Sequence, residues 1–211
     1  MHDAHRRKPR GFHSRGYLPH CDEAGRIQFI SFRLHDSMPI ETIERWKREL
    51  AESPRIRRRE ILRRRIDAYI DRGSGSCLLT DPRIATLVES TLTHGDLRDY
   101  ELLAWCIMPN HVHTLIAPLP DRSLTTIVGG WKSYTAHEAN RILDRQGRLW
   151  FPDYFDTFMK STAQLEDTIA YIEHNPVVAQ LVSSADQWQF SSAFPAHRDR
   201  VVHNRMRHLS V

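Results

Sequence analysis

Cysteine is scarce in this sequence of 211 residues, and its few cysteines are widely spaced. Cys21, Cys77 and Cys106 are odd in number, and no CxxC pair occurs. We therefore expect neither a disulfide framework nor a cysteine-rich zinc site. The same usage fits a reducing compartment, so we expect a cytoplasmic protein.

Long apolar runs are also missing. No segment approaches the roughly 20 apolar residues that a membrane-spanning helix needs. The basic N-terminus is not followed by the apolar stretch of a secretory signal. We expect no membrane partner and one folded domain over residues 22–182, with a basic, irregular arm before it (1–21) and a C-terminal tail after it (183–211).

Positive charge, by contrast, is abundant and clustered. The formal net charge is +4 and the sequence pI is about 9.1. The stretch "RIRRREILRRR" over 55–65 holds seven arginines against one glutamate, and "HRRKPRGFHSRGYLPH" near the N-terminus is also basic. Such segments attract polyanions, above all nucleic acid. The alternative is that these arginines form ordinary solvated helix faces.

Hydrophobic periodicity predicts a mixture of strands and helices. Strand patterns occur over 26–34, 100–108, 111–117 and 154–159, and helical patterns occur over 40–50, 54–70, 82–95, 124–143 and from 162 onward. Only Pro109 and Asn110 separate the second and third strands, as in a hairpin. The order lacks regular βαβ spacing and favours an α+β fold, an antiparallel sheet with helices packed mainly on one face.

Capping residues mark where the helices begin and end. Ser53, Asp81 and Ser123 each precede a helical pattern and are predicted N-caps. The last helix opens with a Ser161-x-x-Gln164 capping box. We expect Pro176 to end it, because the residue before a proline disfavours the helical conformation.

Two histidines stand one residue apart in the apolar stretch "WCIMPNHVHTLIAPL". In a strand, His111 and His113 project to the same face, and Val112 projects to the other. Two imidazoles at this spacing can share a metal ion. They can equally be packing residues at the start of a strand. A histidine-triad nucleotide hydrolase would want another histidine at the next alternating position, where the chain has Leu115.

The last helix offers candidate partners for this pair in "YIEHNP". Tyr171 and Asn175 are four residues apart, so their side chains are neighbours on one helix face. They lie to one side of the apolar stripe formed by Leu165, Ile169 and Ile172. A hydroxyl nucleophile and an amide-oxygen ligand can sit side by side there. The alternative is a boundary tyrosine followed by a helix-ending asparagine.

The chain resembles the REP-associated tyrosine transposases of the HUH superfamily of single-strand nucleases. The resemblance covers most of 15–192 and rests on segments in family order: "RGYLPHCD", "IQFISFRLHDSMP", "WCIMPNHVHTLIAPLP", "WKSYTAHEANR", "LWFPDYFDTFMK" and "YIEHNPVVAQLV". It implies a ferredoxin-like antiparallel sheet with the histidine pair on a central strand. It also implies that His111, His113 and Asn175 bind a divalent ion, Mg²⁺ or Mn²⁺, and that Tyr171 is the nucleophile.

The implied activity is nicking and rejoining of single-stranded DNA next to repetitive hairpin sequences, through a covalent 5′-phosphotyrosine. Basic residues of the arm and one residue beside Gly129 and Gly130 are the expected DNA contacts: Arg6, Arg7, Lys8, Arg10, Arg15 and Lys132. Such a protein is expected near the nucleoid, as a monomer or homodimer.

Two other functions compete with this one. A domesticated relative can grip hairpin DNA without turnover, although a pure binder has no use for the full set of Tyr171, His111, His113 and Asn175. A metal-dependent hydrolase of small nucleotides has no need of the basic segments. One departure from the family pattern follows the last helix, where Gln180 stands in place of the usual glycine and the local turn is expected to differ.

Overall fold

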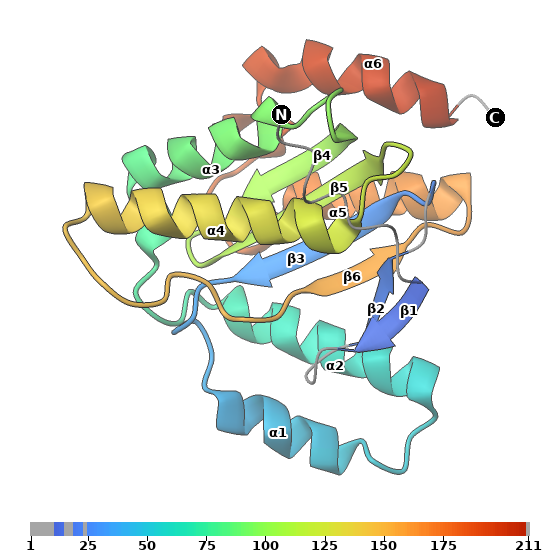
Figure 1. Ribbon diagram of the computed structural model, residues 1–211, viewed down its shortest axis with the longest axis vertical. Helices are drawn as coiled ribbons and strands as arrows, with labels where there is room; N and C mark the ends of the chain where they lie inside the picture. The colour runs from blue at the N-terminus through green and yellow to red at the C-terminus, as the bar shows by residue number, and fades with distance from the viewer. Residues whose placement is uncertain (1–10, 15–18, 23–24, 210–211) are drawn as a thin grey trace, which may run out of the picture.

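The structure is a computed structural model that describes residues 11–14, 19–22 and 25–209 (Figure 1). At its centre is a four-stranded antiparallel sheet with strand order β4-β5-β3-β6. Its strands are β3 (Gln28–Arg33), β4 (Tyr100–Ile107), β5 (His111–Pro118) and β6 (Phe155–Phe158). This order and connection pattern is that of a ferredoxin-like sheet, and the predicted α+β class is confirmed.

Helices pack on both faces of the sheet (Figure 1). α3 (Pro82–His94) and α4 (Leu124–Ile142) cover one face, where Val88 and Val128 join a core with Val112 of β5. α5 (Thr162–Val178) covers the opposite face, where Ile169 packs in a second core with Leu115. The two cores form because successive β5 residues face opposite sides.

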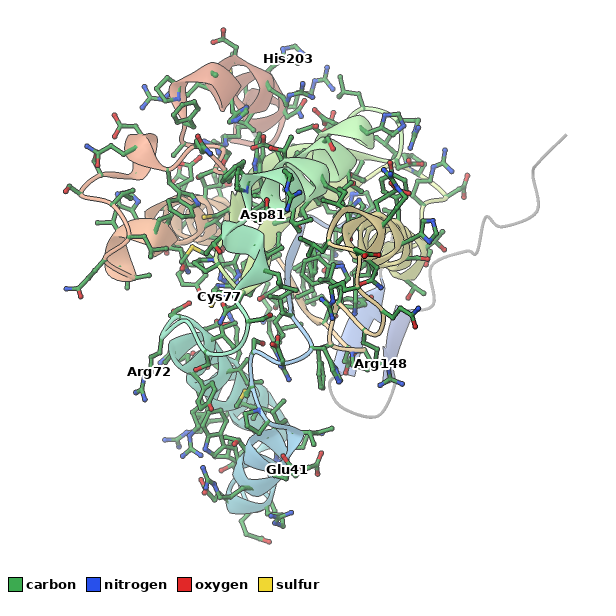
Figure 2. All side chains as sticks on the ribbon, turned by 90° about the vertical axis from the view of Figure 1, so that its left-hand side faces the viewer. Glu41, Arg72, Cys77, Asp81, Arg148 and His203 are labelled. Atoms are coloured by element: carbon green, nitrogen blue, oxygen red, sulfur yellow. The ribbon has the colours of Figure 1, made fainter. Side chains whose placement is uncertain are left out.

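The connection from β3 to α3 forms a helical pair beside the sheet, α1 (Ile40–Glu49) and α2 (Arg55–Ile70). A third small core, formed by Met38, Ile43, Ile70 and Phe151, holds this pair to the rest of the protein. In Figure 2 the pair forms a lobe that runs from Glu41 to Arg72, and the chain then passes Cys77 and reaches Asp81 at the start of α3.

The ends of the chain contain regular structure. β1 (Gly11–Ser14) pairs with β2 (Pro19–Asp22) as an antiparallel hairpin, so the prediction of an irregular arm is wrong for these residues. After α5 come two short 3₁₀ helices, η2 (Ala185–Gln187) and η3 (Pro195–His197), and then α6 (Arg198–Leu209), which packs against β4. None of the helices in the described ranges is long and apolar enough to cross a membrane.

Two predicted helix starts are confirmed in detail. The Asp81 carboxylate accepts a hydrogen bond from the backbone N–H of Arg83 at 2.9 Å. Ser161 Oγ accepts one from the N–H of Gln164, whose side chain in turn accepts from the N–H of Lys160. Each bond satisfies an N–H group that has no partner within the helix.

Other predicted helix ends differ. α2 has Pro54 rather than Ser53 at its N-cap, because Pro54 holds an extended backbone with φ −52° and ψ 140°. Ser123 occupies the N-cap of α4 without a side-chain capping bond. α5 continues through Pro176 to Val178, so the prediction that Pro176 ends it is wrong. A proline removes only one N–H, and the N–H of Ala179 still bonds to the carbonyl of Asn175.

Candidate active site

The histidine pair lies on β5, between β3 and β4, where His111 pairs with Arg33 and His113 with Ser31 of β3. Both imidazoles are fully buried, with 0% exposure. Their Nε2 atoms are 3.0 Å apart and their ring centroids 4.6 Å apart. The alternation of the strand therefore brings the two rings together, on the side of the sheet that α5 covers.

Asn110 fixes the orientation of the first imidazole. Its Nδ2 donates to the backbone carbonyls of Ile70 and Ser74, at 2.9 and 2.8 Å. Its Oδ1 must therefore face His111 Nδ1, which lies 2.8 Å away and donates to it. The proton of the neutral ring thus resides on Nδ1, and Nε2 presents a lone pair.

The phenol of Tyr171 lies beside the second imidazole. The centroid of its ring is 5.4 Å from that of His113 and 6.0 Å from that of Phe29. Its hydroxyl donates to Oδ2 of Asp67 at 3.2 Å. Burial and the nearby charge of Asp67 raise the pKa of Tyr171, so the group is protonated in this conformation.

Asn175 lies one turn beyond Tyr171 on α5, with 3% exposure. Its Oδ1 is buried and has no hydrogen-bond partner among the described residues. A buried amide oxygen without a partner is costly unless something outside the chain satisfies it. This atom is available to a ligand, as its predicted role requires, and that role stays a prediction.

Two carboxylates of the α2 segment were not expected at this site. Asp67 holds the phenol, and Oδ1 of Asp71 lies 3.4 Å from His111 Nε2. Asp71, His111 and His113 offer ligand atoms that all lie within 4.8 Å of one another. The available signal was the four-residue spacing of the two aspartates in "RIDAYID", next to the inner stripe of the helix.

The ionisation of these groups is dominated by burial. Burial lowers the pKa of His111 to about 3 and also lowers that of His113 well below its usual range. Burial, and secondarily the charge of Asp67, raises the pKa of Asp71 to about 7. Near neutral pH, His111 and Asp71 therefore do not form a simple imidazolium–carboxylate ion pair.

The donor set suits a divalent cation. Neutral imidazole nitrogens, a carboxylate oxygen and an amide oxygen are all ligands that divalent ions accept in proteins. Oδ1 of Asp71, Nδ1 of His113 and Oδ1 of Asn175 are buried and have no hydrogen-bond partner within the described part of the chain. The residues present thus fit the ion that the resemblance implies.

The arginine-rich helix contributes one side chain to this site. The Arg63 guanidinium lies over the rings of Phe29 and Tyr171, 4.6 and 5.5 Å from their centroids, and pairs with Asp67. Arg64 and Arg65 instead pair with glutamates nearer the surface. The charge of Arg63 helps to offset the cost of burying Asp67.

Of the residues predicted to contact DNA, only Lys132 lies in the described part of the chain. Arg6, Arg7, Lys8, Arg10 and Arg15 lie outside the described residues. Lys132 is described, and its Nζ donates to the backbone carbonyls of Phe151, Pro152 and Asp153. In this conformation it anchors the loop before β6, and its role as a DNA contact stays a prediction.

A separate cleft lies elsewhere on the protein. A cavity of about 560 Å³ between α3 and α4 is lined by residues that include Arg98, Arg122 and Gly130. These helices cover the face of the sheet opposite the imidazoles. The convergent histidines, phenol and carboxylates, rather than the volume of a cleft, mark the candidate active site.

Comparisons with known proteins point to transposases. Residues 79–175 match the model of a family described as "Transposase IS200 like". The matched span includes His111, His113 and Tyr171 and ends at Asn175. The predicted resemblance to transposases of this kind is confirmed. No curated protein matches the chain.

Two solved structures are similar. One is described as "Structure of the REP associates tyrosine transposase bound to a REP hairpin"; it is 18% identical, with a TM-score of 0.55 over 86% of this chain and 83% of that chain. Another is a putative transposase from Deinococcus radiodurans, 16% identical, with a TM-score of 0.34 over 77% of this chain and 96% of that chain. The first match shows that the two proteins share a fold.

Proposed function

From the match of residues 79–175 to the IS200-like transposase family, we propose that the chain is a metal-dependent single-strand DNA endonuclease and strand transferase. It nicks and rejoins DNA next to repetitive hairpin sequences, and it acts in the cytoplasm, beside the nucleoid. The hairpin named in the description of the structural neighbour supports this class of substrate.

One observation carries the proposal. The phenol of Tyr171 lies beside two buried imidazoles that share a face and point their Nε2 atoms at one another. These side chains come from β5 and α5, some sixty residues apart in sequence. Burying polar nitrogens in a core is unfavourable, and Nδ1 of His113 is buried without a hydrogen-bond partner among the described residues.

The chemistry assigned to the chain begins with the phenol. The Tyr171 oxygen attacks the scissile phosphorus in line, a tyrosyl O–P bond forms, and the bond from phosphorus to the 3′-oxygen breaks. Asp67, which accepts the phenolic hydrogen bond, is the nearest acceptor for the proton, and the departing 3′-oxygen takes up a proton. Reversal of the step by another 3′-hydroxyl rejoins the strand.

His111, His113 and Asn175 would hold the divalent ion, Mg²⁺ or Mn²⁺. When bound, such an ion offsets negative charge on the phosphate oxygens during the transfer. Asn110 keeps His111 Nε2 aimed at that position, and the hydrophobic residues around the pair exclude competing water.

The site is closed in this conformation, since both imidazoles are fully buried and α2 holds the phenol through Asp67. Entry of a single strand requires α2 to move away from the sheet. Arg6, Arg7, Lys8, Arg10, Arg15 and Lys132 then contact DNA phosphates, Lys132 after it leaves its loop carbonyls.

An adduct assay tests the proposal. The full chain is incubated with labelled single strands that carry a hairpin, in the presence of Mn²⁺, and a covalent protein–DNA species is sought on a denaturing gel. We expect the adduct with the wild type and with Tyr134→Phe, an exposed tyrosine of α4, and a loss of at least about 10³-fold with Tyr171→Phe.

Two outcomes contradict the proposal. An adduct that persists in Tyr171→Phe shows that another residue is the nucleophile. Hairpin binding by the wild type with no adduct in any divalent ion favours the binding-protein alternative instead.

A further inference from the structure

Asp71 lies outside the span that matches the transposase family, yet it reaches the histidine pair. It follows the last residue of α2, and its Oδ1 is buried, 3.4 Å from His111 Nε2. The Nε2 atom of His113 lies 3.0 Å from the same His111 nitrogen. Three ligand atoms from two distant segments therefore converge on one point.

The hydrogen bond to Asn110 leaves the Nε2 lone pair of His111 facing the Asp71 oxygen. Because His111 donates from Nδ1 to Asn110, its Nε2 has no proton to offer to Asp71. The Asp71 oxygen has no other hydrogen-bond partner in the described part of the chain. A nitrogen lone pair and an ionised carboxylate oxygen at this distance repel each other unless a proton or a metal cation lies between them, and a metal cation can contact both Asp71 and the two imidazoles.

Hydrogen bonds to the backbone hold Asp71 and His111 close together. Asn110, whose Oδ1 fixes the orientation of His111, also donates from Nδ2 to the carbonyls of Ile70 and Ser74. These two carbonyls bracket Asp71 in the chain. One amide thus holds the imidazole and the carboxylate in a common frame, as the groups around a metal site usually do for its ligands.

The separations match those of ligands around one ion. Two ligands about 2.1 Å from a common ion lie about 3.0 Å apart at an octahedral angle and about 3.4 Å apart at a tetrahedral angle. His111 Nε2 lies 3.0 Å from His113 Nε2 and 3.4 Å from Asp71 Oδ1. A carboxylate also adds the hard, anionic oxygen that Mg²⁺ and Mn²⁺ prefer over imidazole alone.

We propose that Asp71 is an additional protein ligand, beside His111, His113 and Asn175, of the divalent ion in the closed, DNA-free protein. This inference rests on the proposed function for the presence of the ion. It adds that the ion ties α2 to the sheet, so that metal binding and closure of the site are coupled. Movement of α2 to admit DNA would release Asp71 from the ion.

Metal binding without DNA tests the inference. Mn²⁺ is titrated into the full chain, and free Mn²⁺ is followed by its electron paramagnetic resonance signal. We expect one tight site in the wild type, at least about a tenfold weaker site in Asp71→Asn, and no site in His113→Ala. Glu60→Gln, which removes an exposed carboxylate of α2 paired with Arg64, is the control and should bind within about threefold of the wild type.

A second variant tests the position directly and does not depend on a loss of binding. In Asp71→Cys, a thiolate replaces the carboxylate, so the site should prefer Cd²⁺ to Mn²⁺ and show the ultraviolet absorption of a cadmium–thiolate bond. Absence of that absorption when Cd²⁺ is bound overturns the inference. Wild-type affinity for Mn²⁺ in Asp71→Asn, with binding lost in His113→Ala, overturns it as well.

The Mn²⁺-binding experiment and the adduct assay can fail independently of each other. Wild-type protein that binds Mn²⁺ through Asp71 but forms no adduct keeps the metal site and refutes the proposed activity. Adduct formation together with unaltered Mn²⁺ affinity in Asp71→Asn keeps the activity and refutes the role of Asp71. A wild type that binds no Mn²⁺ overturns both the metal site and the metal-dependent function.

Discussion

At the scale of single residues, Gln180 shows how a local departure from a family pattern is absorbed. It has φ +58°, the left-handed conformation that usually favours glycine. The N–H of Gln180 and that of Leu181 close the end of α5 on the carbonyls of Val177 and Pro176. A left-handed turn therefore forms with glutamine in place, at a steric cost of about 1 kcal/mol. The expectation that the glutamine alters this turn is not supported.

Gln180→Gly should raise the free energy of unfolding by about 0.5–1 kcal/mol, because glycine adopts a positive φ without a steric penalty. The neighbouring Ala179→Gly is the matched control. Ala179 has φ −77°, so there glycine only adds freedom to the unfolded chain and should destabilise by up to about 1 kcal/mol. Urea unfolding of both variants measures the difference, and a destabilised Gln180→Gly would contradict the argument.

Some contacts of single residues at the site can be predicted from the sequence and others cannot. The shared face of His111 and His113 follows from strand alternation alone. The contact of Asp71 with His111 does not, because it joins residues forty apart through the hydrogen bonds of Asn110. Likewise, no local pattern indicates that Lys132 donates to carbonyls of a loop some twenty residues away.

At the scale of elements, α6 depends on a buried carboxylate for its position. Glu101 of β4 accepts hydrogen bonds from Arg207 and from His208, the latter at 2.6 Å. Asn204 of α6 adds a bond to the carbonyl of Leu102. Although burial alone would raise the pKa of Glu101, the hydrogen bonds and charges of His208 and Arg207 lower it overall.

The lowered pKa of Glu101 makes the stability of the fold depend on pH. A carboxyl whose pKa is lower in the folded state stabilises the fold above its unfolded pKa of about 4.3. That contribution is lost as the pH falls below this value and through the folded pKa. Glu101→Gln should therefore cost about 1 kcal/mol at pH 7 and progressively less on acidification.

Thermal unfolding between pH 7 and pH 3 measures this effect. The control is Glu60→Gln, which removes an exposed pair with Arg64 and should change stability by less than about 0.5 kcal/mol. A difference between wild type and Glu101→Gln that stays constant down to pH 3 would show that the Glu101 contacts do not depend on its charge.

The elements themselves were largely predictable, for a physical reason. Alternation and helical spacing are local, and they located β3, β4, β5, β6 and the helices between them. The ends were less predictable, because Pro54 takes the cap of α2 and Pro176 is tolerated inside α5. These outcomes depend on one or two hydrogen bonds rather than on a repeated pattern.

At the scale of the whole molecule, the arrangement of layers determines which elements cover the histidine pair. The ferredoxin-like order of the sheet places β5 centrally, and α5 covers the face that carries the histidines. The sequence, with its resemblance, predicted that order. It did not predict that α2 closes over the imidazoles, because this closure requires packing between segments that carry no common periodicity.

The charge of the molecule leads to a prediction on DNA affinity. If the basic arm contacts phosphates, each contact contributes about 0.7 to the slope of log affinity against log salt for a single strand. Replacing Arg6, Arg7, Lys8, Arg10 and Arg15 together with alanine should therefore reduce that slope by about 3.5. It should weaken binding to hairpin-bearing and plain single strands alike, since phosphate contacts do not read sequence.

Fluorescence anisotropy over a salt series measures the slope, and Arg141→Ala with Arg148→Ala serves as the control. Both arginines are exposed, one on the last turn of α4 and one in the loop after it, so their loss changes the net charge without removing the arm. We expect the control to shift the slope by less than about 0.5. If the slope of the arm variant stays that of the wild type, the phosphate contacts belong to the folded domain, and the arginines of α2 become the next surface to test.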